Sequence, residues 1–236
     1  PEMFKALDAS MIGRAARDGI ISLDVRNIRD YSRDKRKRTD DTPFGGGPGM
    51  LMTAQPIDDA LKDLEAERKP VLYLSPRGDV MDQKLLEEIA AEEEIVLLAG
   101  HYEGVDQRIL DKWNIKEVSI GDYILTGGEL PAMVLIDAVT RLLPGVLASR
   151  DSALEESVYS GLLEYPQYTQ PRNYEGMEVP EILLSGDHRK IHLWRMEQAL
   201  ILTKKKRPEM FEEFVKNPGG FAKDEQKVIE KVRHLL

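Results

Sequence analysis

The sequence has no cysteine, and this absence excludes disulfide bonds, zinc sites built from thiolates and thiol nucleophiles. It also lacks any apolar run close to the roughly 18 residues that a membrane-spanning helix needs. No basic and then apolar leader signals export. We therefore expect a cytoplasmic protein with no membrane partner.

Positive charge is also in short supply: 33 Lys and Arg face 42 Asp and Glu, for a formal net charge of −9. This argues mildly against a general nucleic-acid binder, which is usually basic. Two segments are nevertheless locally basic, "RDYSRDKRKR" at residues 29–38 and "KKKR" at residues 204–207. Such patches can bind phosphates on an acidic protein, because electrostatic fields decay within about 10 Å at moderate salt. On charge alone, a solvated surface is the simpler interpretation of both.

With 42% hydrophobic and 32% charged residues among 236, the chain is expected to form one large globular domain or two small ones. Three apolar runs stand out, residues 71–75, 94–100 and 116–128, and each ends in a glycine-bearing loop. Between the runs, apolar residues recur with the spacing of helices. This alternation predicts an α/β fold with a parallel sheet. Within the third run, Tyr123–Leu125 is apolar enough to belong to a strand.

The segment from about Glu129 to Leu143 is apolar on most sides, which predicts a helix buried either in the core or in a subunit interface. Beyond Pro144 the periodicity is lost, and polar residues predict a linker. A second helical pattern follows over residues 188–206, with Asp187 as its N-cap and Pro208 as its stop. Short helices are expected to finish the chain.

The three loops that end the apolar runs read "SPRGD", "GHYEGVD" and "GDYILTGGE". In an open parallel sheet, ligands bind outside the carboxyl ends of the strands, so these loops predict one shared pocket. The glycine motifs of Rossmann dinucleotide sites and of P-loops are absent, which disfavours NAD and ATP by those routes. The loops offer backbone amides, aliphatic carbons and three tyrosines instead of a cluster of cations. Such a lining suits a flat, uncharged base such as adenine.

Five ordered motifs carry a resemblance to a known family. The chain resembles the bacterial tRNA (guanine-N1)-methyltransferases of the TrmD type, which belong to the SPOUT superfamily of knotted methyltransferases. The resemblance covers essentially the whole chain. It is carried by the motifs "YLSPRG", "GHYEGVDQR", "SIGDYILTGGELPAMVLIDAVTR", "GLLEYPQYTQP" and "LSGDHRKIHLWR".

The resemblance implies an α/β fold whose parallel sheet contains a deep trefoil knot, together with a small helical C-terminal domain. Residues 1–148 would form the knotted domain, residues 149–160 an interdomain linker and residues 161–236 the helical, tRNA-binding domain. The knot would bind S-adenosylmethionine, the methyl donor. The residues implied in cofactor binding are Tyr73, Leu74, Ser75, Pro76, Gly100, Tyr102, Glu103, Ile120, Gly121, Asp122, Tyr123, Ile124, Leu125, Gly127 and Gly128.

The implied reaction is methyl transfer to N1 of the guanosine at position 37 of tRNA, next to the anticodon. N1 of guanine bears a proton, so the reaction needs a base, and charge that develops on O6 needs a cation or donor. By position in the family pattern, Glu156 would be the base and Arg141 the cation. The enzyme would be a homodimer whose active site is shared between subunits.

No metal site is expected: His188 and His192 have the i, i+4 spacing of zinc ligands, but no third ligand is evident. No motif of the sequence reports on magnesium. The chain departs from the family pattern at Glu156, where the family usually has Asp, and at Gln170, where it usually has Arg. The family also begins with a strand and a methionine, so a few residues are expected before Pro1.

Other interpretations stay open. Arg141 could simply pair with Asp137 one helical turn away, and Glu156 could be a solvated linker carboxylate. The protein could be a catalytically weak or inactive RNA-binding protein of the same fold. It could also be an unrelated α/β enzyme that uses a nucleotide.

Overall fold

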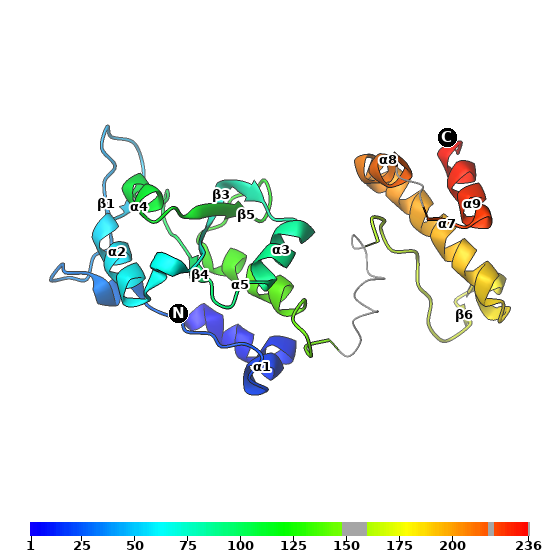
Figure 1. Ribbon diagram of the computed structural model, residues 1–236, viewed down its shortest axis with the longest axis horizontal. Coiled ribbons are helices and arrows are strands. Elements are labelled where there is room, and N and C mark those ends of the chain that lie inside the picture. Colours follow the sequence, from blue (N-terminus) through cyan, green and yellow to red (C-terminus); the bar gives the residue numbers. More distant parts are fainter. Residues whose placement is uncertain (148–159, 217–219, 236) are drawn as a thin grey trace. The chain divides into compact units, whose positions relative to one another are not determined.

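The computed structural model describes residues 1–147, 160–216 and 220–235. The chain divides into two compact units, Pro1–Ala148 and Ser149–Leu236 (Figure 1).

The first unit is built on a parallel sheet of three strands in the order β4-β3-β5 (Figure 1). Strand β3 (Val71–Val80) lies between β4 (Val96–Leu98) and β5 (Lys116–Ser119). In register, Leu72 pairs with Leu97 on one side and with Lys116 on the other. The predicted mixed α/β fold with a parallel sheet is confirmed.

Two hydrophobic cores cover the two faces of this sheet. Successive side chains of a strand point to opposite faces, and β3 follows this rule: Val71 and Tyr73 belong to one core, Leu72 and Leu74 to the other. Helices α2 (Ala54–Asp63) and α4 (Gln107–Lys112) supply the first core. Helices α3 (Gln83–Ala90) and α5 (Glu129–Thr140) supply the second. The sheet is thus the middle of three layers, as the alternating pattern predicts.

Strand β3 is interrupted where the sequence suggests that it ends. Both Leu74 and Asp79 pair with Val118, so the residues between them bulge out of the ladder before the strand resumes. The return requires Gly78, because a Cβ there would lie 2.3 Å from the backbone of Glu117. The "SPRG" loop is therefore an excursion within one strand.

The prediction that Tyr123–Leu125 continues a strand is wrong. Strand β5 ends at Ser119, whose hydroxyl bonds with both the N–H and the carbonyl of Gly121, each at 3.1 Å. Gly121 then turns the chain outward with φ of +141°, a conformation that glycine adopts readily. The apolar tripeptide is consequently a loop, in which Ile124 is 79% exposed.

The remaining elements of the first unit are short. The N-terminal segment forms the 3-10 helix η1 (Glu2–Asp8) and helix α1 (Ser10–Arg17), and η2 (Ile28–Tyr31) and η3 (Ala66–Arg68) are further 3-10 turns. Strands β1 (Asp40–Asp41) and β2 (Leu51–Met52) pair antiparallel, and the glycine-rich loop between them projects from the unit (Figure 1).

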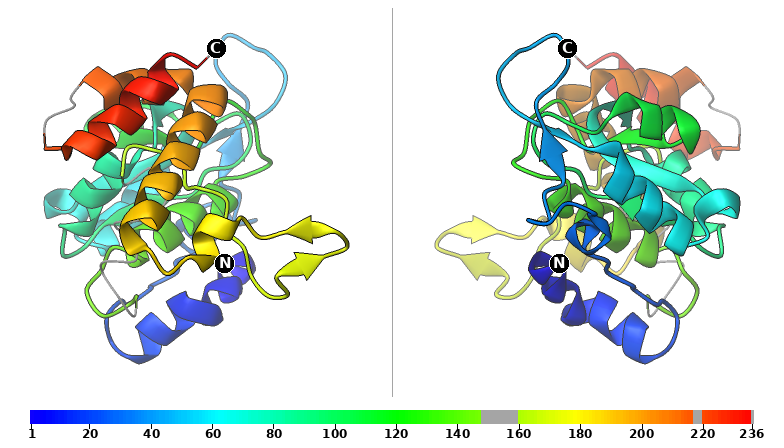
Figure 2. Two further views of the ribbon diagram at one scale, coloured as in Figure 1. Left: turned by 90° about the vertical axis from the view of Figure 1, so that its right-hand side faces the viewer. Right: turned by 90° about the vertical axis from the view of Figure 1, so that its left-hand side faces the viewer.

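The second unit packs three helices around a core of its own: α7 (His188–Lys206), α8 (Pro208–Lys216) and α9 (Lys223–Arg233). Asp187 caps α7 as predicted, accepting from the Lys190 N–H at 3.1 Å. The short turn η4 (Glu181–Leu184) precedes α7. Before it, strands β6 (Asn173–Tyr174) and β7 (Met177–Glu178) form a hairpin that projects from the helices (Figure 2).

Lys204, the first lysine of the basic run at the end of α7, is an internal cap. Its Nζ donates to the carbonyls of Val232, Arg233 and Leu235 at 2.5 to 3.1 Å, where α9 ends. It also lies 5.6 Å from the Phe211 ring centroid. A cation at this position neutralises carbonyls that have no partner within their own helix.

Across the described ranges, no helix is long and apolar enough to cross a membrane. No buried side-chain nitrogen or oxygen of those residues lacks a hydrogen-bond partner.

Asp58 fastens α2 to α4. Its carboxylate, 16% exposed, accepts from Lys112 Nζ at 2.6 Å, Lys62 Nζ at 2.7 Å and Trp113 Nε1 at 2.8 Å. Burial opposes ionisation of this carboxyl, but the three donors outweigh it and hold its pKa well below the usual range.

Replacing Asp58 with alanine is expected to lower the free energy of unfolding by about 1–3 kcal/mol at pH 7, because partly buried donors lose a charged acceptor. Since the folded pKa is depressed, the stabilisation is complete above the unfolded pKa of about 3.9 and is lost as pH falls through the folded pKa. The gap between wild type and variant should therefore shrink below about pH 4. Urea unfolding followed by Trp113 fluorescence, in a Trp194→Phe background, measures it.

Asp63, on the same helix and 54% exposed, is the matched control. Its replacement by alanine should cost less than about 1 kcal/mol. An equal loss for both variants would contradict the role assigned to Asp58.

Candidate active site

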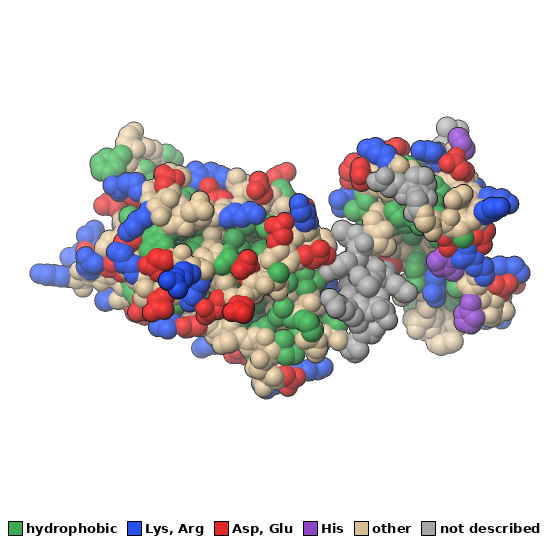
Figure 3. All heavy atoms as spheres, in the orientation of Figure 1, with side chains coloured by type: hydrophobic (Ala, Val, Ile, Leu, Met, Phe, Trp, Pro, Cys, Tyr) green, Lys and Arg blue, Asp and Glu red, His purple; other side chains and the backbone are tan. Residues whose placement is uncertain are grey.

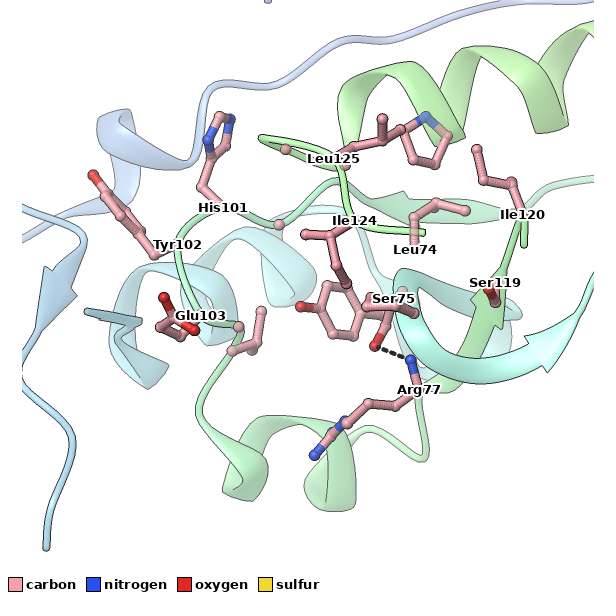
Figure 4. A pocket seen from close by; sticks show the side chains of 18 of the residues that line it. Leu74, Ser75, Arg77, His101, Tyr102, Glu103, Ser119, Ile120, Ile124 and Leu125 are labelled. Carbon is pink, nitrogen blue, oxygen red and sulfur yellow. Dashed lines mark hydrogen bonds between the residues drawn. The ribbon is translucent and has the colours of Figure 1, made fainter. Parts of the chain in front are cut away.

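A cavity of about 400 Å³ lies at the carboxyl ends of the three parallel strands. The loops after β4 and β5 and the bulge within β3 enclose it (Figure 4). In the close-up, His101, Tyr102 and Glu103 come from the loop after β4, the second loop, whereas Ile124 and Leu125 come from the loop after β5, the third loop. The sequence prediction of one shared pocket therefore agrees with the fold.

The structure brings together nearly all the residues that the resemblance implies in cofactor binding. Asp122 is the exception: it is exposed and does not line the cavity. Arg141 follows the end of α5 and does not line it either. Glu156 lies outside the described residues. The implied residues that line the cavity are Tyr73, Leu74, Ser75, Pro76, Gly100, Tyr102, Glu103, Ile120, Gly121, Tyr123, Ile124, Leu125, Gly127 and Gly128.

Sequence reasoning missed several lining residues. Leu51 comes from β2 and Val118 from inside β5, so no quoted motif marked them, whereas Ser119 begins the third motif. His101 and Arg77 also stand within the quoted motifs, and their polar side chains could have marked them. Also missed were Gly104, Val105, Gln107, Thr126 and Pro131.

Arg77 and His101, which border the cavity, each contact a carboxylate. The Arg77 guanidinium donates to both carboxylate oxygens of Glu117 at 2.9 and 3.0 Å and to Gln107 at 3.3 Å. His101 Nε2 lies 2.5 Å from Glu129 Oε1. The walls therefore present mainly backbone, aliphatic carbon and aromatic rings.

Tyr73 forms part of the floor and is 6% exposed. Burial, followed by the nearby Glu117 charge, raises the pKa of this phenol above its ordinary value. The hydroxyl therefore stays protonated at neutral pH. Its ring lies directly against Gly100, where a Cβ would fall 2.7 Å from Tyr73 Cε2.

The second and third loops meet backbone to backbone. The Gly128 N–H donates to the Gly100 carbonyl at 2.7 Å, and His101 and Gly127 form an antiparallel bridge. A Cβ on Gly128 would lie 2.7 Å from Gly100 N and 2.8 Å from Ala99 Cα. Gly128 itself has φ of −83°, which suits any residue, so glycine is required there for space.

The second loop is also held from the β1–β2 side. The Glu103 N–H donates to the Met50 carbonyl at 3.0 Å, and the Met52 N–H donates to the Gly104 carbonyl at 2.9 Å. Tyr102, just before Glu103, has φ of +60°, an uncommon conformation for a residue with a side chain. Such conformations persist where surrounding contacts fix them, and they gather at functional sites.

Within the described ranges, no group of three or more His, Asp or Glu side chains is placed to hold a metal ion. His192 instead contacts Glu225 Oε1 at 3.0 Å.

The fold and the cavity define an α/β protein with a small-molecule pocket at its strand ends. The family model described as tRNA (Guanine-1)-methyltransferase TrmD matches residues 1–213. The chain therefore belongs to this family, which confirms the resemblance drawn from the five motifs.

Curated relatives agree over nearly their full lengths. The tRNA (guanine-N(1)-)-methyltransferase of Moorella thermoacetica is 54% identical over 215 residues, which cover 89% of this chain and 86% of the relative. That of Ruminiclostridium cellulolyticum is 53% identical over 215 residues, 89% of this chain and 92% of the relative. That of Alkaliphilus oremlandii is 49% identical over 242 residues, 99% and 95% of the two chains.

Replacing Gly128 with alanine is expected to push the second and third loops apart, because both clashing groups are backbone and cannot rotate away. Overpacking of this kind costs about 1–3 kcal/mol. Hydrogen exchange should accelerate in peptides that cover residues 99–105 and 119–128. Mass spectrometry measures it.

Gly19→Ala is the control. Gly19 has φ of +73° and open space around it, so alanine there adds about 1–2 kcal/mol of backbone strain far from the cavity. Unchanged hydrogen exchange in the peptides covering residues 99–105 and 119–128 of the Gly128→Ala variant would contradict the close contact between the second and third loops.

Proposed function

We propose that the protein transfers a methyl group from S-adenosylmethionine to N1 of the guanosine at position 37 of tRNA, next to the anticodon. Membership of the TrmD family supports tRNA guanine methylation. The observation that carries the proposal for the cofactor is the glycine-lined cavity at the strand ends.

The cavity fits S-adenosylmethionine chemically. Close contacts leave no space for a Cβ on Gly100, Gly127 or Gly128, so the backbone itself lines the surface and its polar groups can meet an adenine edge. Apolar side chains such as Ile124 and Leu125 supply faces for the ring. The carboxylate of Glu103 borders the cavity, where it would favour a cation. When bound, S-adenosylmethionine supplies an electrophilic methyl group on a positively charged sulfur.

We also propose that the crossing loops belong to the deep trefoil knot of the SPOUT fold. Support for this proposal comes from the hydrogen bond between Gly128 and Gly100, which brings the third loop, after β5, against the second. Residues 1–148 would then be the cofactor domain, and residues 161–236 the tRNA-binding domain that follows the linker at 149–160. The described contacts support this division because every residue that lines the cavity lies in the first unit.

Two groups are assigned to catalysis. Glu156 would take the proton from N1 of guanine, and the Arg141 guanidinium would stabilise the negative charge that develops on O6. Arg141 lies ten residues after Pro131, which borders the cavity, or about 15 Å along the helix direction. A flexible tRNA loop or a second subunit would have to bridge the distance between Arg141 and the cavity.

A homodimer is proposed because α5 carries apolar side chains that its own unit leaves uncovered. Leu130 and Val134, one turn apart, are 46% and 45% exposed. The helix was predicted to be buried in the core or in an interface; its own unit buries Pro131, Ala132 and Leu135 and packs Val139 partly against the core, whereas Leu130 and Val134 stay exposed. A second copy that packs on this face would bury the rest.

The proposed function is tested by Glu156→Gln. Loss of a general base should lower the single-turnover rate of methyl transfer by about 10²–10⁴-fold, while calorimetry should give an unchanged Kd for S-adenosylmethionine. Glu155→Gln is the matched control and should react like wild type. A tRNA with adenosine in place of the target guanosine should receive no methyl group.

The rival functions predict different results for the wild-type protein. An inactive RNA-binding protein would bind tRNA without methylating it. An unrelated nucleotide enzyme would bind ATP or NAD in preference to S-adenosylmethionine. If Glu156→Gln reacts within about threefold of wild type, well below the usual range, Glu156 is not the base.

Sharing of the active site is tested by mixing two inactive subunits, Gly128→Ala with an impaired pocket and Glu156→Gln with an impaired base. If Glu156 serves the partner's pocket, a heterodimer has one intact site, and about half of wild-type activity should return. Tagged heterodimers purified before the methylation assay provide the measurement. No recovery in them would place pocket and base in one subunit.

A further inference from the structure

The loop between β1 and β2 carries an unusual side chain at its tip. Phe44 is 101% exposed, the highest value among the large hydrophobic residues that the structure describes. The segment "DDTPFGGGPGM" is turn-rich in sequence, and neither the cavity nor the proposed catalytic groups account for its aromatic residue.

The loop is open on all sides around Phe44. Gly45, Gly46 and Gly47 have φ of +88°, +77° and +122°, and a Cβ on any of them would meet nothing within 4 Å. The glycines therefore shape the loop without packing it. A fully exposed aromatic ring on a projecting loop has both faces free to stack, and stacking on a flat ligand would remove apolar surface from water.

The base of the loop is fastened to the mouth of the cavity. At one end, Gly49 lies against Glu103, and the Met50 carbonyl accepts from the Glu103 N–H at 3.0 Å. At the other end, Asp40 Oδ1 accepts from the Tyr102 hydroxyl at 3.4 Å. Phe44 is five residues from Gly49, so it lies within about 18 Å of the cavity rim.

Cations accompany the aromatic residue. The basic segment at residues 33–38 leads directly into β1, and Figure 3 shows Lys and Arg side chains at the end of the unit that carries the loop. Arg33 and Arg38 pair with Asp59 and Asp34, respectively. Lys35 and Arg36 are exposed, and neither side chain makes an ion pair with a residue that the structure describes. The two segments project separately from the first unit (Figure 1). Together, exposed cations and an exposed aromatic ring on one unit complement single-stranded RNA, whose phosphates the cations neutralise and whose bases stack on the ring.

The proposed reaction itself creates a need for such a ring. N1 lies on the pairing edge of guanine, and that edge must enter the cavity, so the base has to leave the stack of its loop. The neighbouring base in the RNA loop then exposes one face to water. We propose that Phe44 stacks on a nucleobase adjacent to the target guanosine and so holds the RNA loop open at the mouth of the cavity. This inference rests on the proposed function.

The test uses full-length protein and an RNA hairpin of anticodon stem-loop sequence with the target guanosine. Phe44→Ala should weaken RNA binding by about 5- to 150-fold, the factor that corresponds to a stacking contribution of about 1–3 kcal/mol. Phe44→Leu should be as weak as alanine, since it keeps apolar area without an aromatic face. Phe44→Trp should bind within about threefold of wild type, because the larger ring still stacks.

Two further measurements separate stacking from indirect effects. The Kd for S-adenosylmethionine should be the same in all four proteins, since the ring makes no contact with the cavity. Hairpins with 2-aminopurine on either side of the target should show a fluorescence change with wild type that is lost with Phe44→Leu. Val25→Ala, which truncates another exposed apolar side chain of the unit, is the control and should bind like wild type.

Several outcomes would overturn the inference. RNA affinity of Phe44→Ala within twofold of wild type would do so, and so would restoration by leucine, which would point to a protein surface as the partner. A parallel loss of S-adenosylmethionine affinity would show that the loop acts through the cavity. Failure of the wild-type protein to bind S-adenosylmethionine or methylate the hairpin would instead refute the proposed function. Because Phe44 packs on nothing in its unit, none of these variants should lose stability.

Discussion

The close approach of two backbones at Gly100 and Gly128 is the constraint on which the cavity depends. A side chain at Gly128 would collide with backbone atoms at less than 3 Å, and the one at Gly100 would collide with the Tyr73 ring. With glycine at both positions, the loops after β4 and β5 can share a hydrogen bond and a bridge. The third wall, the bulge of β3, depends on the same device at Gly78. Space, more than conformational freedom, explains why these glycines stand where they do.

The charge of the cavity follows from pairing at its rim. Arg77 is bound to Glu117, so its charge is already compensated, and His101 is bound to Glu129. A triphosphate would find no free cation there within the described residues, whereas an adenine ring needs none. The tyrosine-rich lining and the ion pairs are thus two independent features that both favour an uncharged ring over a triphosphate. The contact between His101 and Glu129 also links the two loops whose backbones cross.

Much of the fold could be predicted from local patterns because those patterns reflect local physics. The alternation of apolar runs and helical spacing predicts the parallel sheet, and an acidic N-cap predicts where α7 begins. The failures are where long-range contacts decide. Tyr123–Leu125 is apolar enough for a strand, yet β5 has already ended at Ser119 and Gly121 redirects the chain out of the sheet. Leu51 reaches the cavity only because β2 packs beside the second loop, which no motif records.

Net charge is a poor guide to this protein because its acids and bases are not equally available. Asp58 binds two lysines, and Arg189 binds Asp224 and Glu225, where hydrogen bonding from its guanidinium lowers the pKa of Asp224 to about 2. In these pairs, a nearby cation compensates the charge of each carboxylate. Lys204, in the basic run at residues 204–207, is likewise used internally, to cap α9. Lys205 and Lys206 beside it are exposed, as are Lys35 and Arg36 in the first unit. Because fields decay within about 10 Å at moderate salt, an RNA strand would respond to these exposed cations and the ring of Phe44 more than to the formal total of −9.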